Sequence, residues 1–220
     1  MGLLDGLKSV LGMRAEADAT READPEDLFG MSTAYVTMEA DLGYAPTGDA
    51  ALCFGDVDST DFADAKAEVE TILDAGGEET GTEADFTTDD HGYQWVVLHD
   101  PDFEDLVTSI HFAADTLIER RYGSRLLAAL FGFEGTAGSK RQRQGGGSAA
   151  DRNGRPVYWV YSFRRGAYYP FAPDPDTANE RDSSAEFKLE SNLDGELSLE
   201  SEKEYWYPLW PDRPGDHPWE

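Results

Sequence analysis

The sequence predicts an α+β fold with a mainly antiparallel sheet and two helices, in the order β-β-α-β-β-α-β-β-β. Two observations support this prediction. Apolar residues recur at helical spacing in only two long segments, whereas the segments around them alternate with period two or are short apolar runs. The strands come in pairs between single helices, which favours antiparallel neighbours over a doubly wound parallel sheet.

A short amphipathic helix is expected at the N-terminus, over residues 1–12. Leu3, Leu4, Leu7 and Leu11 repeat at helical spacing, and polar residues occupy the other side. An acidic, alanine-rich linker completes the first segment, residues 1–24.

Residues 25–173 are expected to form one α+β domain. Asp24 and Pro25 supply a cap and a first-turn proline for a short opening helix. Capping residues and glycine stops set the bounds of the longer helices, including the Gly76-Gly77 pair. The expected strands are 33–39, 50–54, 84–88, 93–99, 126–133, 157–163 and 167–171, and the expected helices are 25–30, 58–75 and 103–121.

Two stretches lack any periodicity. Residues 134–154 are rich in glycine, serine and arginine, which predicts a mobile basic loop within the domain. Residues 174–220 are expected to contain a linker, a terminal segment near 184–199 and an aromatic, proline-rich tail.

The chain is strongly acidic, with 18 Lys and Arg against 45 Asp and Glu, a net charge of −27 over 220 residues. This balance excludes a generic nucleic-acid binder, which needs positive surface to displace counterions from phosphates. Only five of the 18 basic residues are lysines, and the acids are spread along the chain. We interpret this composition as an adaptation to molar salt, where self-repulsion is screened; the competing interpretation is an acidic protein with a basic partner.

The sequence predicts a cytoplasmic protein. No apolar run approaches the roughly 20 residues of a membrane span, and the N-terminus lacks the pattern of a secretory signal. The single cysteine, Cys53, lies in an apolar strand and is expected to be a small buried residue.

No residues with the pattern of a catalytic site emerge from the sequence, and no metal or cofactor is predicted. The four histidines lack ligand spacing, and His111 is expected to be a partly buried structural residue. The stretch GFEGTAGSK resembles a phosphate-binding loop but places its Gly, Lys and hydroxyl residues at the wrong spacing.

Three features instead indicate binding. The first is the N-terminal helix, whose Leu3, Leu4, Leu7 and Leu11 either pack on the domain or contact a membrane or partner. The second is a segment from Arg120 to Arg165 with ten basic residues and two acids, which either neutralises the protein's own acids or holds an anionic partner.

The third feature is an aromatic hairpin around Arg164, Arg165 and Gly166. Both faces of its strands are apolar, so both must be partly covered. We expect partner contacts here rather than in the mobile loop, because ordering a glycine-rich loop costs conformational entropy. The candidate partner-binding residues are Arg164, Arg165, Trp159, Tyr168 and Tyr169.

Several motifs together resemble the PspA-associated protein PspAB family of haloarchaea and actinobacteria. They are MGLLDGL, DLFGMSTAYVT, GYAPTGDAALCF, DDHGYQWVVL, DLVTSIHFAADTL, YGSRLLAALFGF, YSFRRGAYYPFAP and YWYPLW, in this order along the chain. The resemblance implies association with the phage-shock protein A envelope-stress system, often beside a membrane-bound HtpX-type zinc protease. It implies no enzymatic activity.

The first functional hypothesis is therefore a non-enzymatic cytoplasmic accessory protein of a halophile, which binds a PspA-like protein or an HtpX-type protease, with peripheral contact at the inner face of the membrane. The alternative is a nucleotide- or nucleic-acid-binding regulator that uses the basic loop and the aromatic hairpin. The net charge disfavours nucleic acid.

Overall fold

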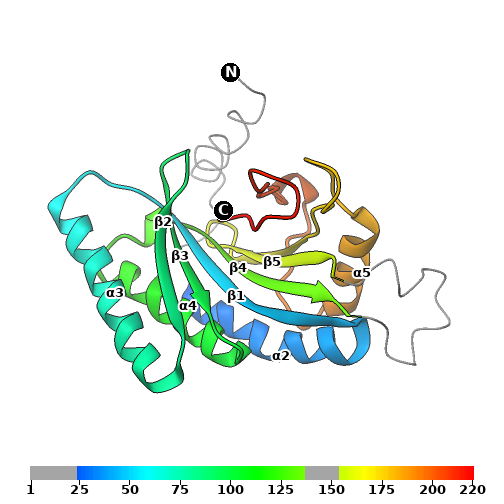
Figure 1. Cartoon of the computed structure of the whole chain (residues 1–220), viewed down its shortest axis with the longest axis horizontal. Helices are drawn as coiled ribbons and strands as arrows, with labels where there is room; N and C mark the ends of the chain where they lie inside the picture. Colours follow the sequence, from blue (N-terminus) through cyan, green and yellow to red (C-terminus); the bar gives the residue numbers. More distant parts are fainter. Residues whose placement is uncertain (1–23, 137–153) are drawn as a thin grey trace.

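A computed structural model describes residues 24–136 and 154–220, and it confirms the predicted α+β class. Its centre is one antiparallel sheet of six strands in the order β2-β3-β1-β4-β5-β6 (Figure 1). The turns at Asp89–Gly92 and Arg164–Gly166 join hairpins as expected. The strands are β1 Tyr44–Gly55, β2 Glu83–Thr88, β3 Tyr93–His99, β4 Leu126–Gly135, β5 Pro156–Ser162 and β6 Ala167–Phe171.

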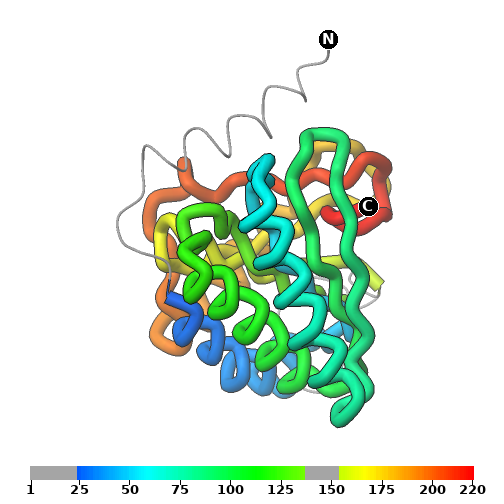
Figure 2. The backbone as a smooth tube through the Cα atoms, turned by 90° about the vertical axis from the view of Figure 1, so that its left-hand side faces the viewer, coloured from blue at the N-terminus to red at the C-terminus, as the bar shows by residue number. Residues whose placement is uncertain are grey.

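Helices form a layer on one face of the sheet. In Figure 2, α4 lies between α3 on one side and the first helical turns of the described chain on the other. The longer helices are α3 Thr60–Thr80, α4 Phe103–Glu119 and α5 Ser183–Leu193. The shorter ones are η1 Pro25–Gly30, α2 Met31–Thr37, the π-helical turn η2 Met38–Leu42, η3 Gly123–Arg125 and η5 Lys203–Tyr205.

The strand predicted at residues 33–39 is wrong, because these residues belong to a continuous helical segment from Pro25 to Leu42. Apolar and polar residues alternate over a few positions, which favours a strand. Over the whole segment, however, the apolar residues have the spacing of a helix. The buried side chains of the segment are spaced by three or four residues, and this stripe packs against α4 and the sheet. They are Leu28, Met31, Ala34, Met38 and Leu42.

Two predicted boundaries also shift. The strand expected at 50–54 is longer than predicted, because β1 begins at Tyr44 and carries a bulge between Pro46 and Ala50 opposite β4. The Gly76-Gly77 pair does not end α3, which continues to Thr80 and stops at Gly81 with a φ of 94°. A Cβ atom at Gly77 would collide with the carbonyl oxygen of Thr82, so this glycine allows the chain to turn back closely into β2.

The sheet has an apolar core on each face, which confirms that both faces of the aromatic hairpin are covered. Trp159 and Tyr161 of β5 point to the helix side, whereas Tyr158 and Val160 point to the opposite side. On that opposite side, Trp206, Leu209 and Trp219 of the C-terminal tail close the second core. Figure 1 shows the tail, in red, on the side of the sheet away from the helix layer.

A buried ion pair fixes the C-terminal segment to the end of the sheet. Arg181 Nε donates to Glu186 Oε1 at 2.7 Å, and the same oxygen accepts from the backbone N–H of Ala172 at 2.9 Å. The Arg181 guanidinium also donates to the carbonyls of Trp206 at 3.0 Å and Pro170 at 3.4 Å. One carboxylate and one guanidinium thereby join α5, β6 and the tail.

Burial raises the pKa of Glu186 above its ordinary value of 4.5. An acid whose pKa is higher in the folded state binds its proton more tightly there than in the unfolded chain. The folded state therefore gains stability from Glu186 as the pH falls from neutral through the raised pKa to 4.5.

We expect the free energy of unfolding of the wild type, relative to Glu186→Gln, to increase as the pH is lowered from neutral toward 4.5. Denaturant unfolding of both proteins at fixed salt measures this difference, and titration of the other carboxylates cancels between them. A difference that is constant with pH, or that decreases on acidification, would contradict the prediction.

Candidate functional site

The aromatic residues predicted to bind a partner are core residues in the structure. Trp159, Tyr168 and Tyr169 have at most 2% of their surface exposed. The Tyr168 hydroxyl donates to the carbonyls of Asp27 and Leu28, both at 3.1 Å, and Tyr169 donates to Tyr207 O at 3.0 Å. These three side chains hold the helix layer and the tail against the sheet and are not available for direct contact with a partner. Sequence alternation alone could not separate a covered face from a binding face.

Arg165 lies at the tip of the hairpin, where it makes a mostly buried ion pair. Its Nε donates to Glu200 Oε2 at 2.6 Å, and the two side chains are 13% and 5% exposed. Its guanidinium lies 3.8 Å from the centre of the Tyr205 ring. The hydrogen bond to Glu200 raises the pKa of Arg165 above its ordinary value. Arg165 thus fixes the strand-like stretch around Glu200 to β6 and has a structural role.

Arg164 points the other way, toward the turn that joins α4 to β4. Its guanidinium donates to the carbonyl oxygen of Ser124 in that turn. Next to it, the N–H of Phe163 donates to the carbonyl oxygen of Leu127, at the start of β4, at 3.2 Å. Two further arginines, Arg121 and Arg125, lie in the same turn. We refer to Arg121, Arg125 and Arg164 as the arginine end of the sheet.

The arginine end lies on two turns at the edge of the sheet, one between α4 and β4 and one between β5 and β6. Arg121 is exposed and takes a left-handed conformation with a φ of 68° immediately after α4. Arg125 is half-buried, with its side chain over Gly55. Within the described residues, neither Arg121 nor Arg125 has an ion-pair partner, whereas Arg120 pairs with Glu68. The sequence does not predict that Arg164 lies near the turn of Arg121 and Arg125, because the two turns are about 40 residues apart in the chain.

The described chain begins close to the hairpin. The Tyr161 hydroxyl donates to the carbonyl of Asp24 at 3.2 Å and to the carboxylate of Asp27 at 2.6 Å. Leu3, Leu4, Leu7 and Leu11 lie outside the described residues, and so does most of the basic loop predicted at 134–154.

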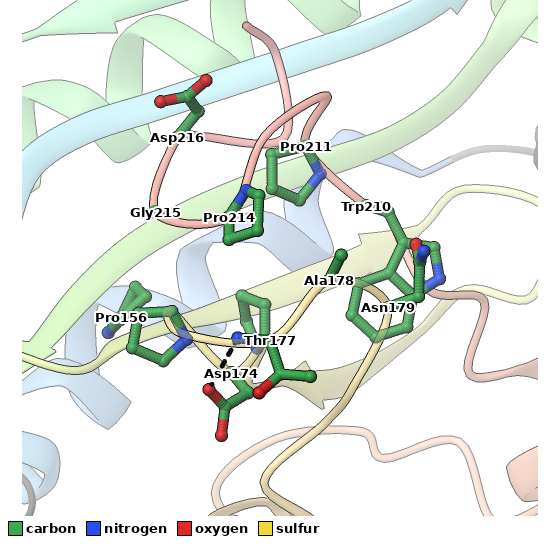
Figure 3. Close-up of a pocket in the computed structure, with 12 residues that line it drawn as sticks. Pro156, Asp174, Thr177, Ala178, Asn179, Trp210, Pro211, Pro214, Gly215 and Asp216 are labelled. Carbon is green, nitrogen blue, oxygen red and sulfur yellow. Dashed lines mark hydrogen bonds between the residues drawn. The ribbon is translucent and has the colours of Figure 1, made fainter.

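A small pocket lies between the loop after β6 and the C-terminal tail, with a volume of about 20 Å³. Figure 3 shows Pro211 and Pro214 of the tail on one side and Pro156 and Thr177 on the other. Asp174 does not present a free carboxylate to it, because Oδ1 accepts from the N–H of Thr177 at 3.1 Å and Oδ2 lies 3.5 Å from Arg155 Nη1. The pocket holds about one water molecule and is too small for a nucleotide.

His111 and Cys53 have structural surroundings. His111 is 9% exposed, with Nε2 3.2 Å from Glu26 Oε1, and Cys53 is buried, as expected for both. In residues 24–136 and 154–220, no group of three or more His, Cys, Asp or Glu side chains is placed to hold a metal ion. None of the helices in those ranges is long and apolar enough to cross a bilayer.

Comparison with known proteins identifies one family. The model of the family PspAB, described as PspA associated protein B, matches residues 1–219. No match is found among curated proteins.

Proposed function

The chain belongs to the PspA associated protein B family, and from this membership we propose that it is a non-enzymatic accessory protein of a PspA-linked envelope-stress response. In this proposal it acts on the cytoplasmic side of the membrane by binding a protein partner. The partner is a PspA-like protein or a membrane-bound HtpX-type protease.

The arginine end is the observation that supports a binding role most strongly. In a chain with a net charge of −27, Arg121, Arg125 and Arg164 are grouped on two turns that the sheet holds in place. Arginine is suited to planar, paired recognition of carboxylates, and a fixed position reduces the entropy lost on binding. We therefore propose that this end of the sheet contacts an acidic surface of the partner.

The alternative, a nucleotide- or nucleic-acid-binding regulator, has less support from the structure. Such a role needs exposed aromatic rings on which bases stack, and the hairpin rings Trp159, Tyr168 and Tyr169 are buried.

We expect the triple variant Arg121→Ala, Arg125→Ala, Arg164→Ala to co-purify much less partner than the wild type in molar KCl. The reason is that contacts made directly by ordered guanidinium groups survive screening better than long-range attraction does. The measurement is co-purification from cells of the native host, quantified by mass spectrometry. Arg165 is left unchanged, because its pair with Glu200 supports the fold.

The matched control is Arg213→Ala, which removes an exposed arginine of the C-terminal tail. This control should co-purify the wild-type amount of partner. Equal recovery by the triple variant and the control would show that the arginine end is not the binding surface. Loss of a bound single-stranded nucleic acid, rather than a protein, from the triple variant would favour the alternative function.

A further inference from the structure

The outer face of the helix layer carries large apolar side chains that the described residues cover only in part. Phe29 is 38% exposed, Val36 52% and Phe112 49%. They are three of the five large apolar residues that are exposed in the described parts of the chain, the others being Phe86 and Phe187. Grouped exposed apolar residues of this size mark an interaction surface more often than scattered ones do.

Ring contacts show how these side chains come together. The Phe29 ring lies 4.7 Å from the ring of His111 in α4, and the Tyr35 ring lies 4.9 Å from that of Phe103. The helical segment 25–42 and α4 therefore run antiparallel. Phe29 and Val36 are two helical turns apart on one side of their segment. The His111 ring, which contacts Phe29, also lies 5.7 Å from the Phe112 ring. Thr33 lies between Phe29 and Val36 on their segment, and Thr108 lies one helical turn before Phe112 on α4. We call this surface the helix-layer face; it consists of Phe29, Thr33, Val36, Thr108 and Phe112.

We propose that the helix-layer face is the docking site of the chain's own residues 1–12. The apolar residues of that segment, from Leu3 to Leu11, span eight residues, or about 12 Å as a helix. The face has a similar length, because Phe29 and Val36 are seven helical residues apart, or about 10 Å. An amphipathic helix laid over two antiparallel helices would cover both phenylalanines and Val36.

The charge of the N-terminal residues favours residues 1–12 as the segment that docks on the helix-layer face. Residues 1–14 contain Lys8 and Arg14 against Asp5, which makes them one of the few basic stretches of an acidic chain. The helix-layer face is bordered by the exposed acids Glu26, Glu39 and Glu104.

The described chain begins at Asp24, five residues before Phe29. The eleven residues from 13 to 23 can span up to about 36 Å, which is enough to return over the face. A tether of this length gives an effective concentration in the millimolar range, so docking within the chain competes well against docking by a separate molecule.

Thiol labelling of the full chain tests the proposal. Thr33→Cys places a thiol in the middle of the face, and the only native cysteine, Cys53, is buried and reports unfolding. We expect Thr33→Cys to react with a maleimide several times more slowly than the same variant carrying Leu3→Ser and Leu7→Ser. Thr71→Cys, exposed on α3, is the matched control and should react at one rate with or without the leucine changes.

Phe112→Ser alters the docking site rather than the segment. In the Thr33→Cys chain it should accelerate labelling as the leucine changes do, and the two changes together should add little more. The same rate for Thr33→Cys with and without Leu3 and Leu7 would overturn the proposal. So would protection that disappears on dilution, which would assign the face to a second copy. The labelling rate does not depend on the arginine end. The docking proposal can therefore fail while the proposed function stands.

Discussion

Replacing Glu186 with alanine is expected to lower the free energy of unfolding by about 3–5 kcal/mol, the usual cost of removing one member of a buried ion pair. The Glu186 side chain accepts from Arg181 at 2.7 Å and from the backbone of Ala172 at 2.9 Å. Without it, the Arg181 charge stays mostly buried between the carbonyls of Pro170 and Trp206, and the N–H of Ala172 loses its partner. Denaturant unfolding measures the change.

Glu190→Ala is the matched control, because Glu190 lies on the same helix and pairs with Lys203 at 2.7 Å in a more exposed place. A pair of this kind contributes about 1 kcal/mol or less. Equal costs for the two variants would mean that the C-terminal segment does not depend on the buried pair for its attachment to the sheet.

Stability is expected to rise steeply between about 0.1 M KCl and the molar range, where the Debye length falls from about 10 Å to about 3 Å. The surface of α3 shows the reason: it carries seven acids and one lysine within 21 residues. Like charges so close together repel across the folded surface when they are poorly screened. The measurement is the thermal unfolding midpoint over a series of KCl concentrations.

Sucrose at matched osmolality is the control, because it favours compact states without screening charge. A midpoint that stays flat with KCl, or that rises equally in sucrose, would contradict the interpretation of the composition as an adaptation to molar salt.

The elements that the sequence predicted well are those with one clear period. The long stripe from Leu106 to Leu117 identified α4, and the apolar runs of β3 and β5 identified strands. The strand predicted around Val36 is wrong because a short alternation of apolar and polar residues coincides there with the three-and-four spacing of Met31, Ala34 and Met38. That helical signal was present in the sequence and could have been found by using a longer window.

The candidate site was less predictable, because it depends on contacts between segments far apart in the chain. Because both faces of β5 are apolar, other segments must pack on both sides of the sheet. The sequence does not show that Trp206 and Trp219 pack on the side opposite the helices. Arg164 and Arg165 are neighbours with different surroundings, one at the exposed turn beside Ser124 and one paired with Glu200. Only the three-dimensional arrangement separates a candidate contact residue from a structural one.

The proposed role is tested most directly by a binding measurement between the purified full chain and a purified PspA-like protein from the same host, by size-exclusion chromatography with light scattering in molar KCl. We expect a complex of defined mass that forms with the wild type and with Arg213→Ala and is lost in the triple variant of Arg121, Arg125 and Arg164. Two separate peaks for the folded wild type and the PspA-like protein, with no complex at any ratio, would contradict direct binding of this chain to a PspA-like protein.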